Sequence, residues 1–99
     1  MIKDVYRYGF QPHVPREEIE ASLLLALLAT ESLHGESQVR LDAAYYLDPE
    51  QRGCVIEAGT PVGRDINRLF VGFLRREFGE DAFTVERVAQ HERQPQSAA

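Results

Sequence analysis

The chain has 99 residues, 43% of them hydrophobic, and a single cysteine, so one domain can bury a core but cannot form an internal disulfide. Its 16 acidic and 11 basic residues give a net charge of −5, which argues against general nucleic-acid binding. The longest apolar run, residues 23–29, is far shorter than the roughly 20 residues that span a bilayer. We therefore expect a cytoplasmic protein without a membrane segment.

The opening segment has the alternation of a strand, because Tyr6, Tyr8 and Phe10 fall on one face. Two prolines then interrupt it, and Pro15 suits the first turn of a helix. That helix is expected over 15–34. It ends at Gly35, a residue that readily adopts a left-handed cap.

The first expected helix is apolar on more than the face that a core requires. The surplus face consists of Ala21, Leu24, Leu25 and Leu28. Either the second helix of the same chain covers this face, or a second copy of the chain does in a symmetric homodimer. We expect the homodimer to use these four residues.

Residues 38–47 alternate between apolar and polar side chains, which predicts a half-buried strand. Turn-forming residues fill 48–53, and residues 54–58 alternate again. The two segments are therefore expected to form an antiparallel hairpin.

Thr60 and Pro61 are typical of a helix N-cap and of the first helical residue. The second helix is expected to run to Phe78 and to end at Gly79. A last strand is expected over 81–88. We predict one domain over 1–89 and a disordered tail over 90–99, which has too few apolar side chains to pack.

The resulting order of strands and helices is βαββαβ, which predicts an α+β two-layer sandwich of the ferredoxin-like type. Both helices would cover one face of an antiparallel sheet whose first and third strands are central. If the opening segment is not a strand, a three-stranded αββαβ sandwich is the alternative.

A candidate anion site lies at the turn from Gly59 to Gly63, which reads Gly-Thr-Pro-Val-Gly and leads into a helix. We expect Thr60, Gly63, Arg64 and Arg68 to bind a phosphate or carboxylate there, with Arg75 on the same outward stripe. The competing interpretation is a solvated helix face with exposed ion pairs.

Other chemistry has weaker support. Tyr6, Tyr8 and Tyr46 would stack single-stranded nucleic acid only if they lined the open face of the sheet, and that face is not basic. The three histidines (His13, His34, His91) lack paired metal-ligand spacing, so we expect no metal and no cofactor. Cys54 is interpreted as a small buried hydrophobe, because no base and orienting group accompany it.

Together these patterns favour a small non-enzymatic binding domain over an enzyme built around Cys54 or a histidine. We expect it to self-associate and then to bind a protein partner or a small anionic ligand. The anion or nucleotide-phosphate sensor is the alternative function, and a single-stranded nucleic-acid module is the third.

Overall fold

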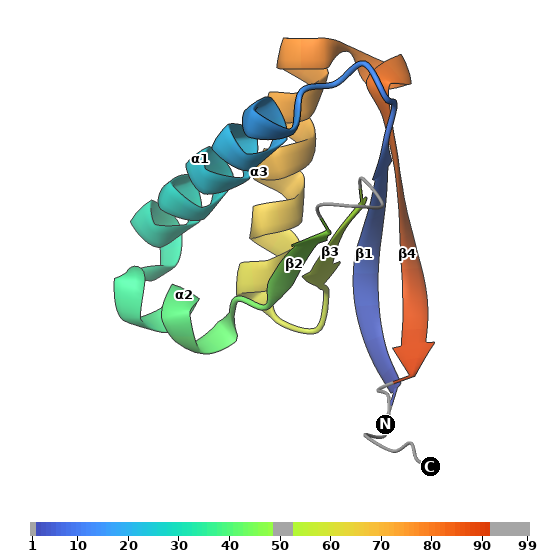
Figure 1. The fold of residues 1–99 in the computed structure, drawn as a ribbon. Helices are drawn as coiled ribbons and strands as arrows, with labels where there is room; N and C mark the ends of the chain where they lie inside the picture. Colours follow the sequence, from blue (N-terminus) through green and yellow to red (C-terminus); the bar gives the residue numbers. More distant parts are fainter. Residues whose placement is uncertain (1, 49–52, 92–99) are drawn as a thin grey trace.

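Four strands form one antiparallel sheet, and the helices lie over one of its faces (Figure 1). The structure is a computed structural model and describes residues 2–48 and 53–91. Its elements in chain order are β1 (Ile2–Phe10), α1 (Arg16–His34), α2 (Glu36–Asp42), β2 (Tyr45–Asp48), β3 (Gly53–Glu57), α3 (Pro61–Phe78), the 3-10 helix η1 (Glu80–Ala82) and β4 (Phe83–His91).

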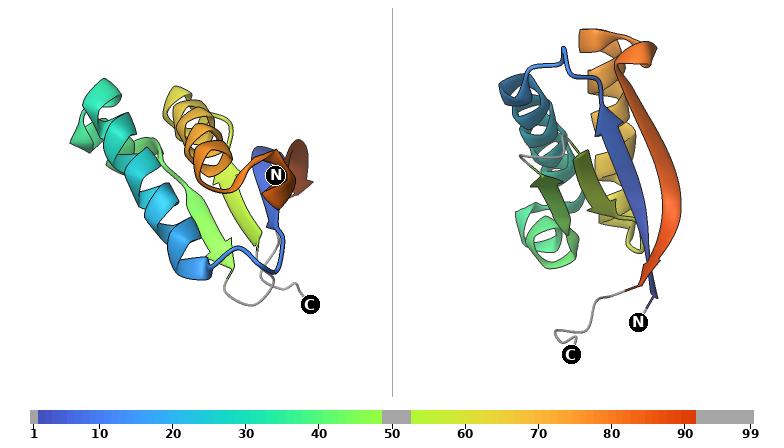
Figure 2. Two further views of the ribbon diagram at one scale, coloured as in Figure 1. Left: turned by 90° about the horizontal axis from the view of Figure 1, so that it is seen from above. Right: turned by 45° about the vertical axis from the view of Figure 1, so that its right-hand side comes forward.

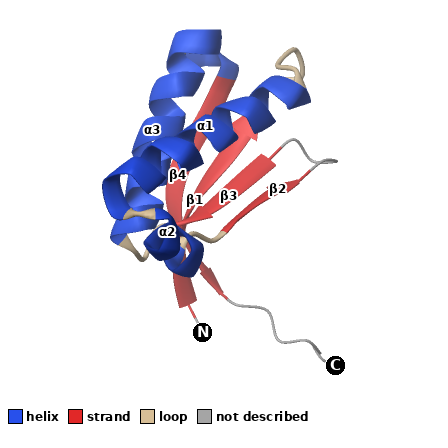
Figure 3. Cartoon of the chain, turned by 90° about the vertical axis from the view of Figure 1, so that its left-hand side faces the viewer, coloured by secondary structure: helices blue, strands red, loops and turns tan. Residues whose placement is uncertain are grey.

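The strand order is β2-β3-β1-β4, and every neighbouring pair is antiparallel. The prediction that the first and third strands are central is therefore confirmed, as is the α+β class. Because the opening segment is strand β1, the three-stranded alternative is wrong. Figure 3 shows the helices in front of one sheet face, with β2 at the margin of the sheet.

The core lies between this sheet face and the helices. Tyr8 of β1 is 1% exposed, and its ring lies 4.9 Å from that of Phe70 on α3. Phe10 and Phe83 pair directly across β1 and β4 and complete an aromatic cluster with them. Each of these aromatic side chains buries about 150–250 Å², so the cluster is a large component of the core.

Helix α3 begins and ends where the sequence predicts, whereas α1 begins one residue later than predicted, at Arg16, and ends as predicted at His34. The side chain of Thr60 accepts a hydrogen bond from the Gly63 N–H at 3.0 Å, and Pro61 opens α3. Gly35 after α1 and Gly79 after α3 both have positive φ, near 87° and 89°, which glycine adopts without steric cost.

The strand predicted over 38–47 is wrong in its first half, because residues up to Asp42 belong to helix α2. Two side-chain pairs spaced four residues apart support that helix: Arg40 with Glu36 at 2.7 Å, and Gln38 with Asp42 at 2.7 Å. The part of the chain that the structure describes therefore has three α-helices where two were expected. The second half of the prediction is confirmed, since β2 and β3 form an antiparallel pair. Most of the turn predicted between them, residues 49–52, lies outside the described residues.

The last strand begins two residues later than predicted and continues to His91, paired throughout with β1. The start of the predicted tail, residues 90 and 91, therefore belongs to the sheet. The remainder of that predicted tail, residues 92–99, lies outside the described residues.

Candidate functional site

The surplus apolar face of α1 is exposed within the single chain. Leu24, Leu25 and Leu28 keep 56%, 54% and 50% of their surface accessible. Ala21 is exposed as well. Helix α1 instead buries a separate stripe made by Ile19, Ser22, Leu23, Ala26 and Thr30. Packing against α3 therefore does not cover the four predicted interface residues.

Two of these leucines lie beside apolar side chains of β2. One hollow of about 370 Å³ is lined by residues that include Leu24, Leu27, Leu28 and Tyr45. A second, of about 220 Å³, shares Leu24, Leu27 and Tyr45 and adds Leu47. We call these five side chains the α1–β2 surface.

The α1–β2 surface extends onto the margin of the sheet. Within residues 2–48 and 53–91, β2 is the outermost strand on that side and pairs only with β3. In Figure 1, α1 and β2 lie toward the same side of the molecule, with α2 at one end. An exposed edge strand beside exposed leucines is a surface on which another polypeptide can pack.

The predicted anion site has its backbone donors already satisfied. The Gly63 N–H donates to the Thr60 hydroxyl at 3.0 Å, and the Arg64 N–H donates to the Thr60 carbonyl at 3.0 Å. The Arg64 guanidinium donates to the Ala58 carbonyl at 3.2 Å. The Gly63 N–H, the Arg64 N–H and the Arg64 guanidinium therefore each have a partner inside the chain.

The outward arginine stripe of α3 is present. Arg64, Arg68 and Arg75 are all exposed, and Arg68 lies 3.9 Å from Asp65 with 83% of its side chain accessible. This agrees with the interpretation of a solvated helix face, and anion binding by the stripe stays a prediction.

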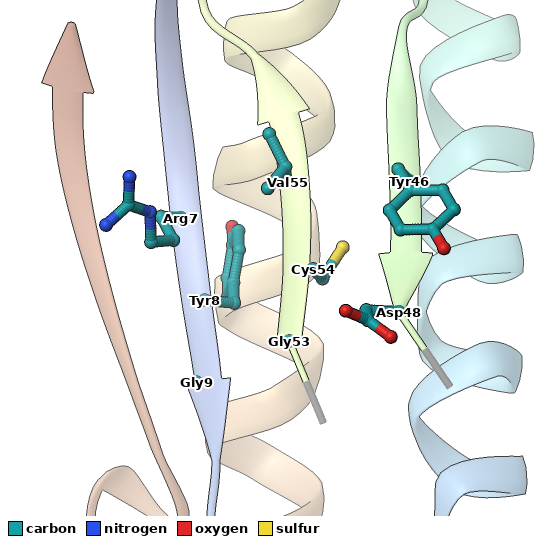
Figure 4. Close-up of a pocket in the computed structure, with 8 residues that line it drawn as sticks. All are labelled: Arg7, Tyr8, Gly9, Tyr46, Asp48, Gly53, Cys54 and Val55. Atoms are coloured by element: carbon teal, nitrogen blue, oxygen red, sulfur yellow. The ribbon is translucent and has the colours of Figure 1, made fainter. Parts of the chain in front are cut away.

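A further hollow lies on the open face of the sheet, and sequence reasoning did not identify it. Gly9 and Gly53 stand directly opposite each other on β1 and β3, so no side chain fills that point of the sheet. Figure 4 shows Arg7, Tyr46 and Asp48 near this bare backbone. The hollow measures about 300 Å³.

The tyrosines considered for base stacking do not share one surface. Tyr8 is buried on the helix side, and Tyr6 packs against the same core. Tyr46 is 62% exposed on the open face, where Arg7 stands opposite Glu86 across β1 and β4. This face is mixed in charge, as expected, and it carries one exposed ring rather than a row of rings.

Two buried groups have strongly shifted acid–base properties. Burial raises the pKa of the Cys54 thiol to about 12, so the thiol stays protonated at neutral pH. Burial is also the main cause of the raised pKa of Tyr8, whose hydroxyl donates to the side-chain oxygen of Asn67. The interpretation of Cys54 as a buried hydrophobe is confirmed by its 1% exposure.

The polar side chains include one pair that joins two helices. His34, the last residue of α1, lies with Nε2 2.8 Å from an Asp65 oxygen on α3. In residues 2–48 and 53–91, no three His, Cys, Asp or Glu side chains are grouped so as to hold a metal ion. Across the same residues, every helix is too short or too polar to cross a membrane.

Comparison of the chain with protein-family models, with curated proteins and with solved structures finds no match in any of the three.

Proposed function

We propose that this chain is a non-enzymatic interaction domain that self-associates through the α1–β2 surface. The observation that carries the proposal is the exposure of Leu24 and Leu28, by half or more, beside hollows lined by Leu27 and Tyr45. Soluble monomers rarely leave a contiguous apolar patch of this kind in water. A second copy of the chain would cover it with the same surface, as two-fold dimers do.

The energy available from the leucines is appreciable. Burying a whole leucine contributes about 1.5–3 kcal/mol, so burying the exposed half of one contributes about 1 kcal/mol. Two copies of Leu24 and Leu28 then supply about 4 kcal/mol, which lies at the low end of the ~4–15 kcal/mol cost of association. A stable dimer therefore also needs the contacts of Tyr45, Leu27 and Leu47.

The experiment is sedimentation velocity or light scattering of the full chain from about 1 μM to about 1 mM, a range that detects weak dimers. We expect the double variant Leu24→Glu with Leu28→Glu to be monomeric. Its melting temperature should equal that of the wild-type chain at a concentration at which the wild-type chain is monomeric. The matched control is Leu33→Glu, on the same helix and 66% exposed, but outside both hollows. It should still dimerise.

Two results would contradict this proposal. One is a wild-type chain that stays monomeric at the highest concentration. The other is unfolding of the double variant under conditions where the Leu33→Glu control remains folded, since this would place the leucines in the core of the single chain.

The alternative proposal, an anion or nucleotide-phosphate sensor, now depends on the exposed arginines of α3. Arg68 and Arg75 extend into solvent and are available to an acidic ligand or partner. The satisfied donors of Gly63 and Arg64 make it the weaker of the two proposals. A single-stranded nucleic-acid role has only Tyr46 in support.

We also propose that the fold is a ferredoxin-like sandwich into which α2 has been added ahead of the second strand. The central position of β1 and β3, with α1 and α3 over one sheet face, supports this assignment. A cytoplasmic location is proposed with it, supported by one cysteine that is free and buried.

A further inference from the structure

We infer that the chain self-associates by pairing the β2 edge of one copy with the β2 edge of a second copy in an antiparallel, two-fold arrangement. The two sheets would then form one continuous sheet of eight strands, four from each copy. This inference rests on the proposed function and specifies the contact that would form it.

The hydrogen-bond pattern of β2 determines which backbone groups point outward. The Glu57 N–H donates to the Ala44 carbonyl at 2.8 Å, and the register places these two residues opposite each other. Hydrogen-bonded and non-hydrogen-bonded pairs alternate along an antiparallel ladder. Tyr46 therefore faces β3 with its N–H and C=O, whereas Tyr45 and Leu47 direct theirs away from the sheet.

Only one two-fold register uses all of these outward groups. When Tyr45 stands opposite Leu47 of the second copy, the N–H and C=O of both residues pair, which gives four main-chain hydrogen bonds in the dimer. Centring the pairing on Tyr45 leaves the Leu47 C=O without a donor, because the Ala43 N–H opposite it already donates to the Val39 carbonyl. Centring it on Leu47 carries Tyr45 past Asp48, the last residue of β2 in the second copy, so the Tyr45 N–H and C=O have no strand residue opposite them.

The side chains agree with the same register. Tyr46 lies on the two-fold axis and meets Tyr46 of the second copy as a non-hydrogen-bonded pair, in which side chains are closest. Tyr45 and Leu47 meet across the axis on the helix side, next to Leu24. The centre of β2 carries no charge, so identical charges do not face each other there; Asp48 falls opposite an alanine, Ala44.

The area available is a substantial part of what a dimer needs. Tyr45 and Tyr46 are 48% and 62% exposed, and an aromatic side chain buries about 150–250 Å², so the two rings offer about 200 Å². A standard interface buries about 800 Å² on each partner. The exposed halves of Leu24 and Leu28 and the backbone of the edge itself extend the contact toward that value.

The other edge of the sheet is unsuited to the same contact. Strand β4 has exposed Glu86 and Arg87 in its middle, and Arg87 is engaged with Asp4 at 3.1 Å. Charged side chains along an edge discourage pairing with another strand. The edge with an uncharged centre is therefore β2, the one beside the exposed leucines.

The decisive test removes one outward N–H without changing a side chain. The chain can be assembled by native chemical ligation at the Gly53–Cys54 junction, which permits an N-methyl group on Leu47. Methylation removes two of the four hydrogen bonds in the dimer and places a methyl group in the contact. Each hydrogen bond contributes about 1 kcal/mol to binding, and about 1.4 kcal/mol corresponds to a tenfold change in the dissociation constant. Because two bonds are lost and the methyl group adds a steric conflict, we expect the dissociation constant of the dimer to rise at least about thirtyfold.

The matched control is an N-methyl group on Tyr46, whose N–H faces β3. This variant should weaken the fold of the single chain, whereas the Leu47 variant should keep the circular dichroism and melting temperature of the unmethylated ligated monomer. Edge pairing is overturned if methylated Leu47 dimerises as tightly as the unmethylated chain while Leu24→Glu with Leu28→Glu is monomeric; self-association then survives in another geometry. If the wild-type chain is monomeric, both the edge pairing and the proposed self-association are overturned.

Cross-linking gives a second readout that does not depend on ligation. On the axis, a non-hydrogen-bonded pair has Cα atoms about 4.5 Å apart, so Tyr46→Cys should form an intermolecular disulfide when diamide takes up the two electrons and two protons. Tyr45→Cys is the control, because its own mate is a diagonal neighbour at about 7–8 Å, beyond the range of a disulfide. Equal cross-linking of both variants, or of Tyr45→Cys alone, excludes the register. Cys54 is buried in the wild-type chain, so we expect it to take no part in this cross-link.

Discussion

Replacing Gly63 by alanine tests why α3 carries a glycine in its first turn. A Cβ atom at this position would lie 2.0 Å from the Glu57 carbonyl oxygen and 3.1 Å from its carbon. Side-chain Cβ atoms essentially never approach another heavy atom closer than 3.0 Å, so α3 or the end of β3 must move by about 1 Å. The glycine is therefore expected to be required for packing, with no ligand involved.

The magnitude follows from two opposing effects. Overpacking costs about 1–3 kcal/mol, and the upper end applies because the obstacle is backbone that cannot rotate away. Alanine returns up to about 1 kcal/mol through its helix propensity. We expect Gly63→Ala to lower the free energy of unfolding by about 2 kcal/mol, which lowers the melting temperature by about 10 °C in a domain of this size.

Gly72 provides a matched control on the same helix. A Cβ there has no heavy atom within 4 Å, so Gly72→Ala should gain up to about 1 kcal/mol from propensity alone. Urea titrations followed by far-ultraviolet circular dichroism, at one protein concentration, measure both variants. If Gly63→Ala proves as stable as Gly72→Ala, the close approach of α3 to Glu57 is wrong.

The remaining predictions concern the buried polar groups. Tyr8→Phe removes the hydroxyl that donates to Asn67 and should lower the free energy of unfolding by about 1–2 kcal/mol in urea titrations; an unchanged midpoint would show that this bond contributes nothing. Burial raises the pKa of Cys54 from 9.0 to about 12, so the unfolded chain loses this proton first as the pH rises. Stability should therefore fall between about pH 9 and 12, and Cys54→Ala should reduce the slope measured from about pH 8 to 10.5; an identical slope in both proteins would count against the shift. Part of the slope should remain, because the pKa of Tyr8 is raised as well.

The long helices were predictable because local chemistry specifies their ends. Thr60 and Pro61 cap and open α3, and the glycines after each helix adopt positive φ, as predicted. Strand β1 was equally local, since Tyr8 and Phe10 alternate into the core. In these segments the periodicity, the caps and the tertiary packing all favour the same structure.

Helix α2 was missed because a short segment with alternating apolar residues fits two periods. Val39 and Leu41 would share one face of a strand, but in the helix only Val39 is buried, and Leu41 is 78% exposed. The spacing of Glu36 and Arg40, four residues apart with opposite charges, was the available sign of a helix. Seven residues are too few for periodicity to decide between the two structures.

The candidate sites were predictable only where one element contains them. The surplus leucines of α1 follow from the angular spacing of a single helix, and they are exposed in the structure. The hollow at Gly9 and Gly53 required knowledge of which residues of β1 and β3 face each other. Likewise, the contact between Gly63 and the Glu57 carbonyl depends on how α3 packs against β3, which no local pattern reports.

The pairing of β1 with β4 has a consequence for synthesis of the chain. These strands lie side by side along nine residues, from Ile2 opposite His91 to Phe10 opposite Phe83 (Figure 2). A ribosome makes β1 before β4, and 72 residues separate Phe10, the end of β1, from Phe83, the start of β4. During that interval the edge of β1 that later pairs with β4 has no hydrogen-bond partners, and the ring of Phe10 lacks its contact with Phe83. The nascent protein therefore has a period of vulnerability to wrong pairing that closes only when its last strand emerges.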